Sequence, residues 1–154
     1  MTTRIKLLAT AGVAVTAFWP AAASAPAAGP TVERSTLTET YADDFALEVC
    51  GVKTMTTLTQ RLVIKTYADG TEIVHVNARY VPADRRVATE QLSRTEIYAP
   101  DGTLTIKGLA IRLSRKGEGT IIRDAGWIHF YEDGILMRGP HDFFGTDDPA
   151  DFYC

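Results

Sequence analysis

Histidine and cysteine are scarce in this chain of 154 residues, which has three of the first and two of the second. The cysteines stand at positions 50 and 154, and neither belongs to a Cys-x-x-Cys pair or lies near clustered histidines. The aspartates of the tail, Asp147, Asp148 and Asp151, lack the D-x-D-x-D-G spacing of a calcium loop. These absences exclude the common zinc and calcium motifs, and we expect no metal and no cofactor.

Long hydrophobic runs are missing after the start of the chain. The run from Leu7 to Phe18 has too few residues to span a bilayer, which needs about 20. Arg4 and Lys6 precede it and small residues follow it, which is the pattern of an export signal. We predict a signal peptide over residues 1–27, a secreted (extracellular) protein, and no membrane partner after cleavage.

Positive charge is not in excess. The chain has 16 Lys and Arg against 19 Asp and Glu, and loss of Arg4 and Lys6 with the signal gives 14 − 19 = −5. A net negative charge disfavours binding to nucleic acid or to an anionic membrane. We therefore expect neither partner.

Catalytic motifs are missing too. The sequence has no G-x-S-x-G elbow, no H-E-x-x-H pair and no glycine-rich phosphate loop. His141 and Asp142 form half of an acid–base pair that no nearby motif completes. We assign no catalytic residue, and we expect the Pro-, Gly- and Asp-rich tail over 140–154 to be irregular and to cap one end of the fold.

Helical periodicity is nearly absent, and alternating apolar and polar residues take its place. These segments are typical of strands separated by turns. They predict a flexible lead over 28–43 and an all-β domain over 44–154, an antiparallel up-and-down meander of seven or eight strands. The expected strands are 45–50, 56–67, 71–81, 88–98, 103–114, 120–131 and 135–139.

Asp-Gly pairs recur at 69, 101 and 133, a spacing of 32 residues each time. Pro100 fits the first central position of a type I turn, which favours a three-residue loop ending in a left-handed glycine. We extend this loop to all three pairs. In the first hairpin it places Ile64 opposite Val74 and Leu62 opposite Val76 on one largely apolar face.

The two cysteines lie at the sheet end opposite these turns if every connection is a hairpin. An even pair in a secreted protein predicts a Cys50–Cys154 disulfide, with two free thiols as the alternative. Such a bond would tie the first strand to the region of the last. We therefore expect the meander to close as a barrel.

The middle hairpin, over 88–114, mixes charged and apolar residues on one face. The members of this face are Glu90, Leu92, Arg94, Glu96 and Tyr98, opposite Leu104, Ile106, Gly108, Ala110 and Arg112. If the face is inside, Arg94 or Arg112 would hold an anionic group and Glu90 or Glu96 would accept a proton. The alternative, to which we give more weight, buries the other face, which is Ser93, Thr95, Ile97, Leu109, Ile111 and Leu113.

In the next strand Trp127, His129 and Tyr131 share a face. They would line a ligand cavity or, alternatively, pack in the core. Gly126 within this strand predicts a bulge or the close approach of another segment. The candidate ligand-binding residues are Arg94, Glu96, Tyr98, Arg112 and Trp127.

Short motifs along the chain, "DDFALEVCG", the Tyr-x-Asp-Gly turn, "DAGWIHF", "RGPHD" and "DFYC", resemble those of small secreted actinobacterial proteins of unknown function. The resemblance implies secretion and a β-domain with paired cysteines, and it transfers no active-site residue. In outline the expected architecture is also similar to calycin-type and allene oxide cyclase or dirigent-type barrels, an analogy of fold alone.

These observations favour a secreted β-barrel that binds a small, partly apolar molecule or an extracellular protein, without chemistry of its own. A cyclase- or isomerase-type enzyme with a charged interior is one alternative. A structural or interaction protein with a filled barrel is the other.

Overall fold

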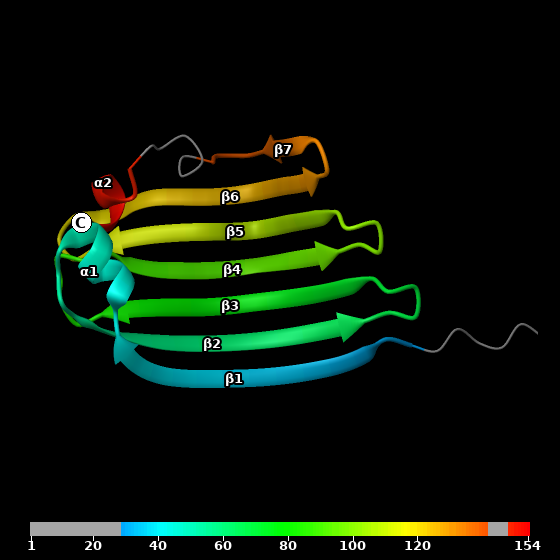
Figure 1. Cartoon of the computed structure of the whole chain (residues 1–154), viewed down its shortest axis with the longest axis horizontal. Coiled ribbons are helices and arrows are strands. Elements are labelled where there is room, and N and C mark those ends of the chain that lie inside the picture. The colour runs from blue at the N-terminus through cyan, green and yellow to red at the C-terminus, as the bar shows by residue number, and fades with distance from the viewer. Residues whose placement is uncertain (1–28, 142–147) are drawn as a thin grey trace, which may run out of the picture.

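The computed structural model describes residues 29–141 and 148–154. The predicted signal peptide lies outside this range. Seven strands form one antiparallel sheet in which each strand pairs with its neighbours in the chain (Figure 1). The elements are β1 Thr31–Ala42, α1 Asp44–Cys50, β2 Met55–Thr66, β3 Glu72–Pro82, β4 Thr89–Tyr98, β5 Leu104–Arg115, β6 Gly119–Tyr131, β7 Gly134–Arg138 and α2 Ala150–Tyr153.

The prediction of an all-β antiparallel meander is confirmed. The sheet has β1 and β7 at its edges, and no hydrogen-bonded pairing joins these two strands in the described part of the chain. Closure into a barrel therefore stays a prediction. None of the described helices is long and apolar enough to cross a membrane.

The first two Asp-Gly loops have the expected three residues. Tyr67 pairs with Thr71 and Ala99 pairs with Thr103, so that Gly70 and Gly102 end the loops with φ of 87° and 84°. The register of the first hairpin is the predicted one, with Ile64 opposite Val74. These turns lie at one end of the sheet, and α1 and α2 lie at the other (Figure 1).

The third Asp-Gly loop differs from the expectation. Tyr131 pairs with Gly134, so that Glu132 and Asp133 alone form the loop. No proline precedes this aspartate, whereas Pro100 is present in the second turn. Nothing in the local sequence therefore excludes the shorter connection.

The prediction of a strand over 45–50 is wrong, because these residues belong to helix α1. Asp43 caps the helix by accepting a hydrogen bond of 2.9 Å from the Ala46 amide, and Asp44 adds a negative charge in the first turn. Gly51 ends the helix with φ of 64°. The segment is too short for its hydrophobic periodicity to distinguish a helix from a strand. The capping residues Asp43 and Gly51 favour the helix.

The flexible lead predicted over 28–43 is wrong for most of its length, since Thr31–Ala42 form β1. All twelve residues of β1 are exposed, so the strand has no buried apolar row that would reveal it. It is held by its full-length pairing with β2. Its threonines suit a strand because their branched side chains fit a pleated surface.

The two faces of the sheet have different roles. Strand residues two apart share a face, as do paired residues on neighbouring strands. We call inner the face that carries the buried cluster of Leu58, Val74, Val76, Ala78 and Leu92, and outer the opposite face. Helices α1 and α2 cover one end of the inner face, where Tyr153 packs against Ala88, Leu113 and Ile122.

The inner-face side chains of the middle hairpin include the charged ones. Glu96 is 8% exposed and Leu92 is buried, whereas Ser93 is exposed. The arrangement to which we gave more weight, with the charged face outside, is therefore wrong. A register shift between Leu109 and Ile111 then changes which residues of β5 face inward. Before the shift the even-numbered side chains are on the inner face, and after it Leu113 is on that face and buried.

The close approach predicted at Gly126 is confirmed. A Cβ atom at this position would overlap the backbone oxygen of Arg138 and would lie 3.1 Å from the Cα atom of Gly139. The φ of Gly126 is 136°. The absence of a side chain lets the end of β7 lie directly on β6.

Candidate functional site

A pocket at the α1/α2 end of the inner face is the candidate site. Its volume is about 290 Å³. We call it the tyrosine pocket because three tyrosines from different elements line it. Its lining residues are Tyr41, Asp43, Phe45, Thr56, Tyr80, Pro82, Val87, Ala88, Glu90 and Tyr153.

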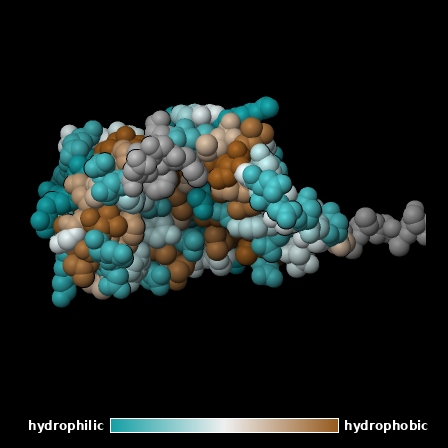
Figure 2. All heavy atoms as spheres, turned by 45° about the horizontal axis from the view of Figure 1, so that its top comes forward, coloured by the Kyte–Doolittle hydropathy of each residue, from teal (hydrophilic) through white to brown (hydrophobic). Residues whose placement is uncertain are grey.

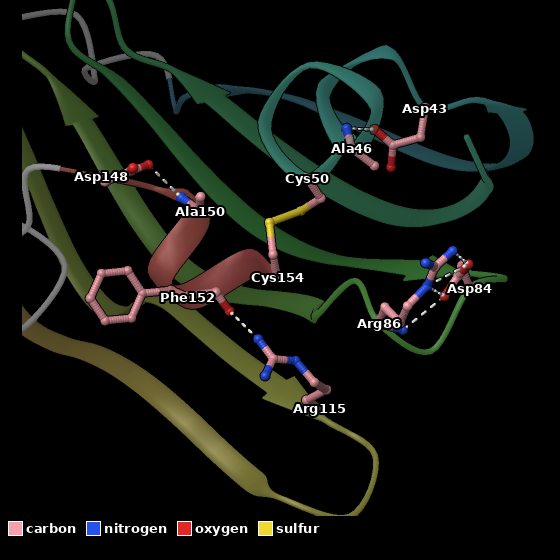
Figure 3. The surroundings of a disulfide bond; sticks show 10 residues. All are labelled: Asp43, Ala46, Cys50, Asp84, Arg86, Arg115, Asp148, Ala150, Phe152 and Cys154. Carbon is pink, nitrogen blue, oxygen red and sulfur yellow. Dashed lines mark hydrogen bonds and ion pairs between the residues drawn. A yellow bond between two sulfur atoms is a disulfide. The ribbon is translucent and has the colours of Figure 1, made fainter. Parts of the chain in front are cut away.

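The disulfide joins the segments that contribute Phe45 and Tyr153 to the pocket. Cys50 at the end of α1 is bonded to Cys154 after α2, with Cα atoms 5.5 Å apart (Figure 3). The predicted disulfide is thus present in the structure. The bond fixes the short helix that carries Tyr153. The Tyr153 ring packs edge-on against the Phe45 ring, with the ring centroids 4.9 Å apart.

Backbone contacts also hold α2 against the sheet. The Ala88 amide donates a hydrogen bond of 2.8 Å to the Tyr153 carbonyl. The Arg115 guanidinium donates one of 3.2 Å to the Phe152 carbonyl (Figure 3). These bonds place the Tyr153 side chain over β4.

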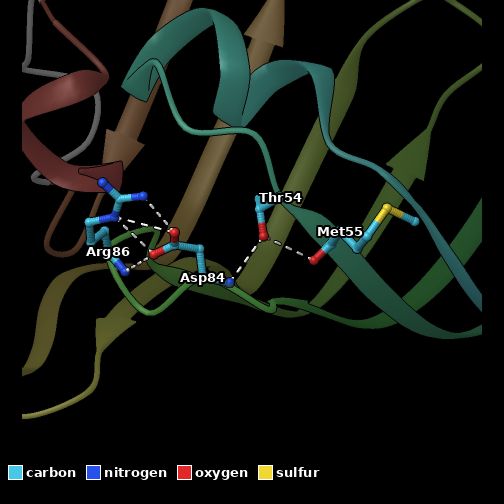
Figure 4. A network of polar contacts seen from close by, with 4 residues as sticks. All are labelled: Thr54, Met55, Asp84 and Arg86. Atoms are coloured by element: carbon cyan, nitrogen blue, oxygen red, sulfur yellow. Dashed lines mark hydrogen bonds and ion pairs between the residues drawn. The ribbon is translucent and has the colours of Figure 1, made fainter.

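The loop between β3 and β4, which supplies Val87 and Ala88 to the pocket, is held by a hydrogen bond to Thr54. The Thr54 hydroxyl accepts a hydrogen bond from the Asp84 amide at 3.0 Å and donates to the Met55 carbonyl (Figure 4). Arg86 pairs with the Asp84 carboxylate at 2.7 Å. The hydrogen bonds from Arg86 lower the pKa of Asp84 to about 2. The loop that brings Val87 and Ala88 to the pocket is thereby anchored to the start of β2.

Glu90 is the central polar group of the pocket. Its carboxyl accepts a hydrogen bond of 2.6 Å from the Tyr153 hydroxyl. Burial raises the pKa of Glu90, and the hydrogen bond from Tyr153 and the charge of Arg94 oppose this shift without cancelling it. Glu90 therefore keeps its proton to a higher pH than an exposed glutamate does.

The tyrosines are shifted in the same direction. Burial first, and then the charge of Glu90, raise the pKa of Tyr153 and of Tyr80. Burial and the Asp43 carboxylate raise the pKa of Tyr41. The hydroxyl groups thus remain protonated and can donate hydrogen bonds.

Asp43 lines this pocket, but its carboxylate stabilises the fold. Besides capping α1, its carboxylate accepts a hydrogen bond from the hydroxyl of Thr56 on β2. Both carboxylate oxygens are therefore engaged within the protein. Glu90 and the three tyrosines are the polar groups that a ligand would meet.

A smaller compartment of about 140 Å³ adjoins the tyrosine pocket and shares Glu90 with it. Its remaining lining is mostly apolar and comes from β4, β5 and β6. We call it the apolar compartment, and its lining residues are Glu90, Leu92, Arg94, Ile106, Ala110, Ile111, Asp124 and Ile128. A molecule with a polar and an apolar part would find both environments in contact.

Three of the predicted ligand-binding residues meet on the inner face beside these cavities. Arg94 is paired with Glu96 at 2.7 Å and donates to the Ala110 carbonyl at 3.1 Å. Tyr98 donates a hydrogen bond of 2.6 Å to the other Glu96 oxygen, which raises the pKa of Tyr98 to about 12. These groups satisfy one another, and Arg94 is the one of the three that lines the apolar compartment.

The other two predicted residues lie on the opposite face. Arg112 pairs across the strands with Gln91, to which it donates a hydrogen bond, because the register shift in β5 turns it outward. Trp127 is paired with Lys107 and stacks on His129 at 5.5 Å, with Arg138 over its ring. The structure does not bring Arg112 or Trp127 together with Arg94.

Residues that sequence reasoning missed supply most of the tyrosine pocket. Tyr80 lies opposite Leu58 on the inner face, and the three-residue loop of the first hairpin implies this pairing. Tyr153 directly precedes the predicted disulfide cysteine. No sequence pattern indicates a site at Tyr41 or Asp43, because the sequence predicts neither strand β1 nor helix α1.

The tail over 140–154 is described only in part. Asp142 and Asp147 lie outside the described residues. Within the described ranges, no group of three His, Cys, Asp or Glu side chains could hold a metal ion. No family model, curated protein or solved structure matches the chain.

Proposed function

We propose that the protein binds a small, partly apolar molecule in the tyrosine pocket. The observation that carries this proposal is the contact between a pocket of about 290 Å³ with hydroxyl and carboxyl groups and an apolar compartment of about 140 Å³. Ligand sites typically combine an apolar lining with a few polar groups that fix orientation. A filled interior, the structural alternative, would leave no such space.

Location and fold closure are part of the same proposal. The export-type start of the chain and the disulfide support secretion, and the motif resemblance supports an actinobacterial origin. The ligand would then be an extracellular molecule. Barrel closure, with β1 near β7 in solution, would enclose it further.

The test is capture of a ligand from the culture medium of the source organism. Purified protein is incubated with the medium, and native mass spectrometry then records any added mass. A bound small molecule is expected for the wild type and for Glu132→Gln, which removes a carboxylate at the opposite end of the sheet. Glu90→Gln should weaken capture about tenfold, since it replaces the central polar group. Equal capture by both variants would contradict the proposal.

Glu90 also supports a second candidate, an isomerase- or cyclase-type reaction. A buried carboxyl with a raised pKa beside phenol hydroxyls is the arrangement that general acid–base chemistry uses. Of the groups first considered for this role, Glu96 is tied to Arg94, and Arg112 is on the outer face. Conversion of the captured ligand by the wild type but not by Glu90→Gln would favour the enzyme.

A further inference from the structure

Charge is segregated between the two faces of the sheet. No Asp or Glu occupies any outer-face position in the seven described strands. The strand carboxylates are all on the inner face, and they are Glu33, Glu39, Glu72, Glu90, Glu96 and Asp124.

The outer face carries most of the cations of the strands. Its arginines are Arg34, Arg61, Arg79, Arg112, Arg123 and Arg138. Lys65 and Lys107 add two further positive charges. None of these side chains forms an ion pair with another described residue. The outer face is therefore strongly positive although the whole chain is net negative.

Three of these arginines lie in one row across the strands. Arg79 on β3 is paired with Gln91 on β4, which is paired with Arg112 on β5, and Arg112 is paired with Arg123 on β6. Adjacent strands are about 4.8 Å apart. The row would thus offer guanidinium groups two strand spacings apart between Arg79 and Arg112, and one spacing apart between Arg112 and Arg123, to an extended anion.

A shallow depression of about 450 Å³ continues the row towards β1. Its outer-face side chains bear hydroxyl, amide and guanidinium groups, and they are Thr36, Thr59, Arg61, Asn77, Arg79 and Gln91. These groups can hydrogen-bond to the hydroxyls of a sugar, and the arginine fork matches a carboxylate with two bonds.

We propose that the outer face binds a linear polysaccharide whose sugars carry carboxylates. Charge complementarity selects a polyanion, and the polar depression selects sugars over nucleobases. Binding of a single-stranded nucleic acid relies on aromatic side chains on which bases stack. The depression has none, and the outer-face rings of Trp127, His129 and Tyr131 lie apart from it on β6, where they stack on one another. This site is separate from the tyrosine pocket on the other face.

The test measures affinity for polygalacturonate, with dextran as the neutral polymer. Arg61→Gln/Arg79→Gln removes two exposed cations from the depression. Arg85→Gln/Lys116→Gln is the matched control, because it removes two exposed cations from the loops at the end of the sheet. Affinity should fall about tenfold in the first variant and less than about twofold in the control, and added salt should weaken wild-type binding.

Equal losses in the two variants, or equal binding of dextran, would overturn the proposal. Tighter binding of oligothymidylate or of phosphatidylglycerol vesicles would also overturn it, because the occupant would then be a nucleic acid or a membrane. Thermal unfolding checks that each variant is folded. If Arg61→Gln/Arg79→Gln is not, Lys107→Gln/Arg123→Gln tests the other end of the row with the same expectation.

Discussion

The Glu90 carboxyl lies under α2, where it accepts the hydrogen bond of Tyr153. Because its pKa is raised above the ordinary value of 4.5, the native chain holds this proton over a pH range in which the unfolded chain has released it. The native state then binds more protons than the unfolded state, so this group makes stability fall as the pH rises through that range. Below the ordinary pKa the effect is absent.

Glu90→Gln should remove this dependence. The free energy of unfolding of the variant, relative to the wild type, is expected to increase as the pH rises above the ordinary glutamate pKa of 4.5, since only the wild type must bury an ionising carboxyl. Urea unfolding at several pH values measures it. Parallel curves for the two proteins would show that Glu90 titrates as in the unfolded chain.

Arg94 and Glu96 form an ion pair in which Glu96 is almost fully buried. Arg94→Leu should destabilise the protein by about 3 kcal/mol, because a buried carboxylate loses its partner. Arg94→Leu/Glu96→Leu should recover much of this loss. Chemical denaturation of both variants tests the pair, and a double variant less stable than the single one would refute its description as a mutually dependent unit.

At this scale, the sequence predicted that Arg94, Glu96 and Tyr98 share a face, because all three are on one unbroken strand. It misplaced Arg112, because a bulge is invisible without the partner strand. The Tyr98 hydroxyl bonds to Glu96 rather than pointing to a ligand. Such mutual satisfaction depends on side-chain positions that alternation does not specify.

At the scale of secondary-structure elements, turn chemistry was the most informative signal. Pro100 and the Asp-Gly pairs predicted two loops and the register of the first hairpin. Segments without an apolar row were misjudged, as β1 and α1 show. Capping residues determine α1, and pairing with β2 along its full length determines β1. Neither feature produces a hydrophobic periodicity in the sequence.

The contact between Gly126 and Gly139 predicts a local effect. Gly126→Ala would place a methyl group against the Arg138 carbonyl and should detach β7 from β6. Faster amide exchange is expected over residues 134–138, with β2 and β3 unchanged. Gly102→Ala is the control, since its site is open and only its φ of 84° is strained. Equal exchange at β7 in the two variants would contradict the account.

At the scale of the whole molecule, the end opposite the Asp-Gly turns depends on the disulfide. The bond closes 104 residues of chain and anchors the helix that carries Tyr153. Figure 2 shows hydrophobic and hydrophilic side chains interspersed over the visible face of the molecule.

Cys50→Ser/Cys154→Ser should lower the free energy of unfolding by about 4 kcal/mol, from the restored entropy of the unfolded chain. Denaturant unfolding measures the loss. In the same variant, Tyr153 should become accessible to tetranitromethane sooner than in the wild type. A variant with unchanged stability and unchanged nitration of Tyr153 would show that the bond does not hold this end together.

Overall topology could be predicted from the sequence, since hairpin parity placed both cysteines at one end. The charge distribution could not, because net charge says nothing of which face a side chain occupies. The pocket also required the fold, as Tyr41, Tyr80 and Tyr153 come from segments that only the sheet and the disulfide bring together.

Binding of a small molecule in the tyrosine pocket is tested most directly by a crystal structure of protein purified from its own culture medium. Electron density for a non-protein molecule is expected in contact with Tyr80, Glu90 and Tyr153. A pocket filled by water alone, whether or not a polysaccharide occupies the outer face, would contradict this expectation.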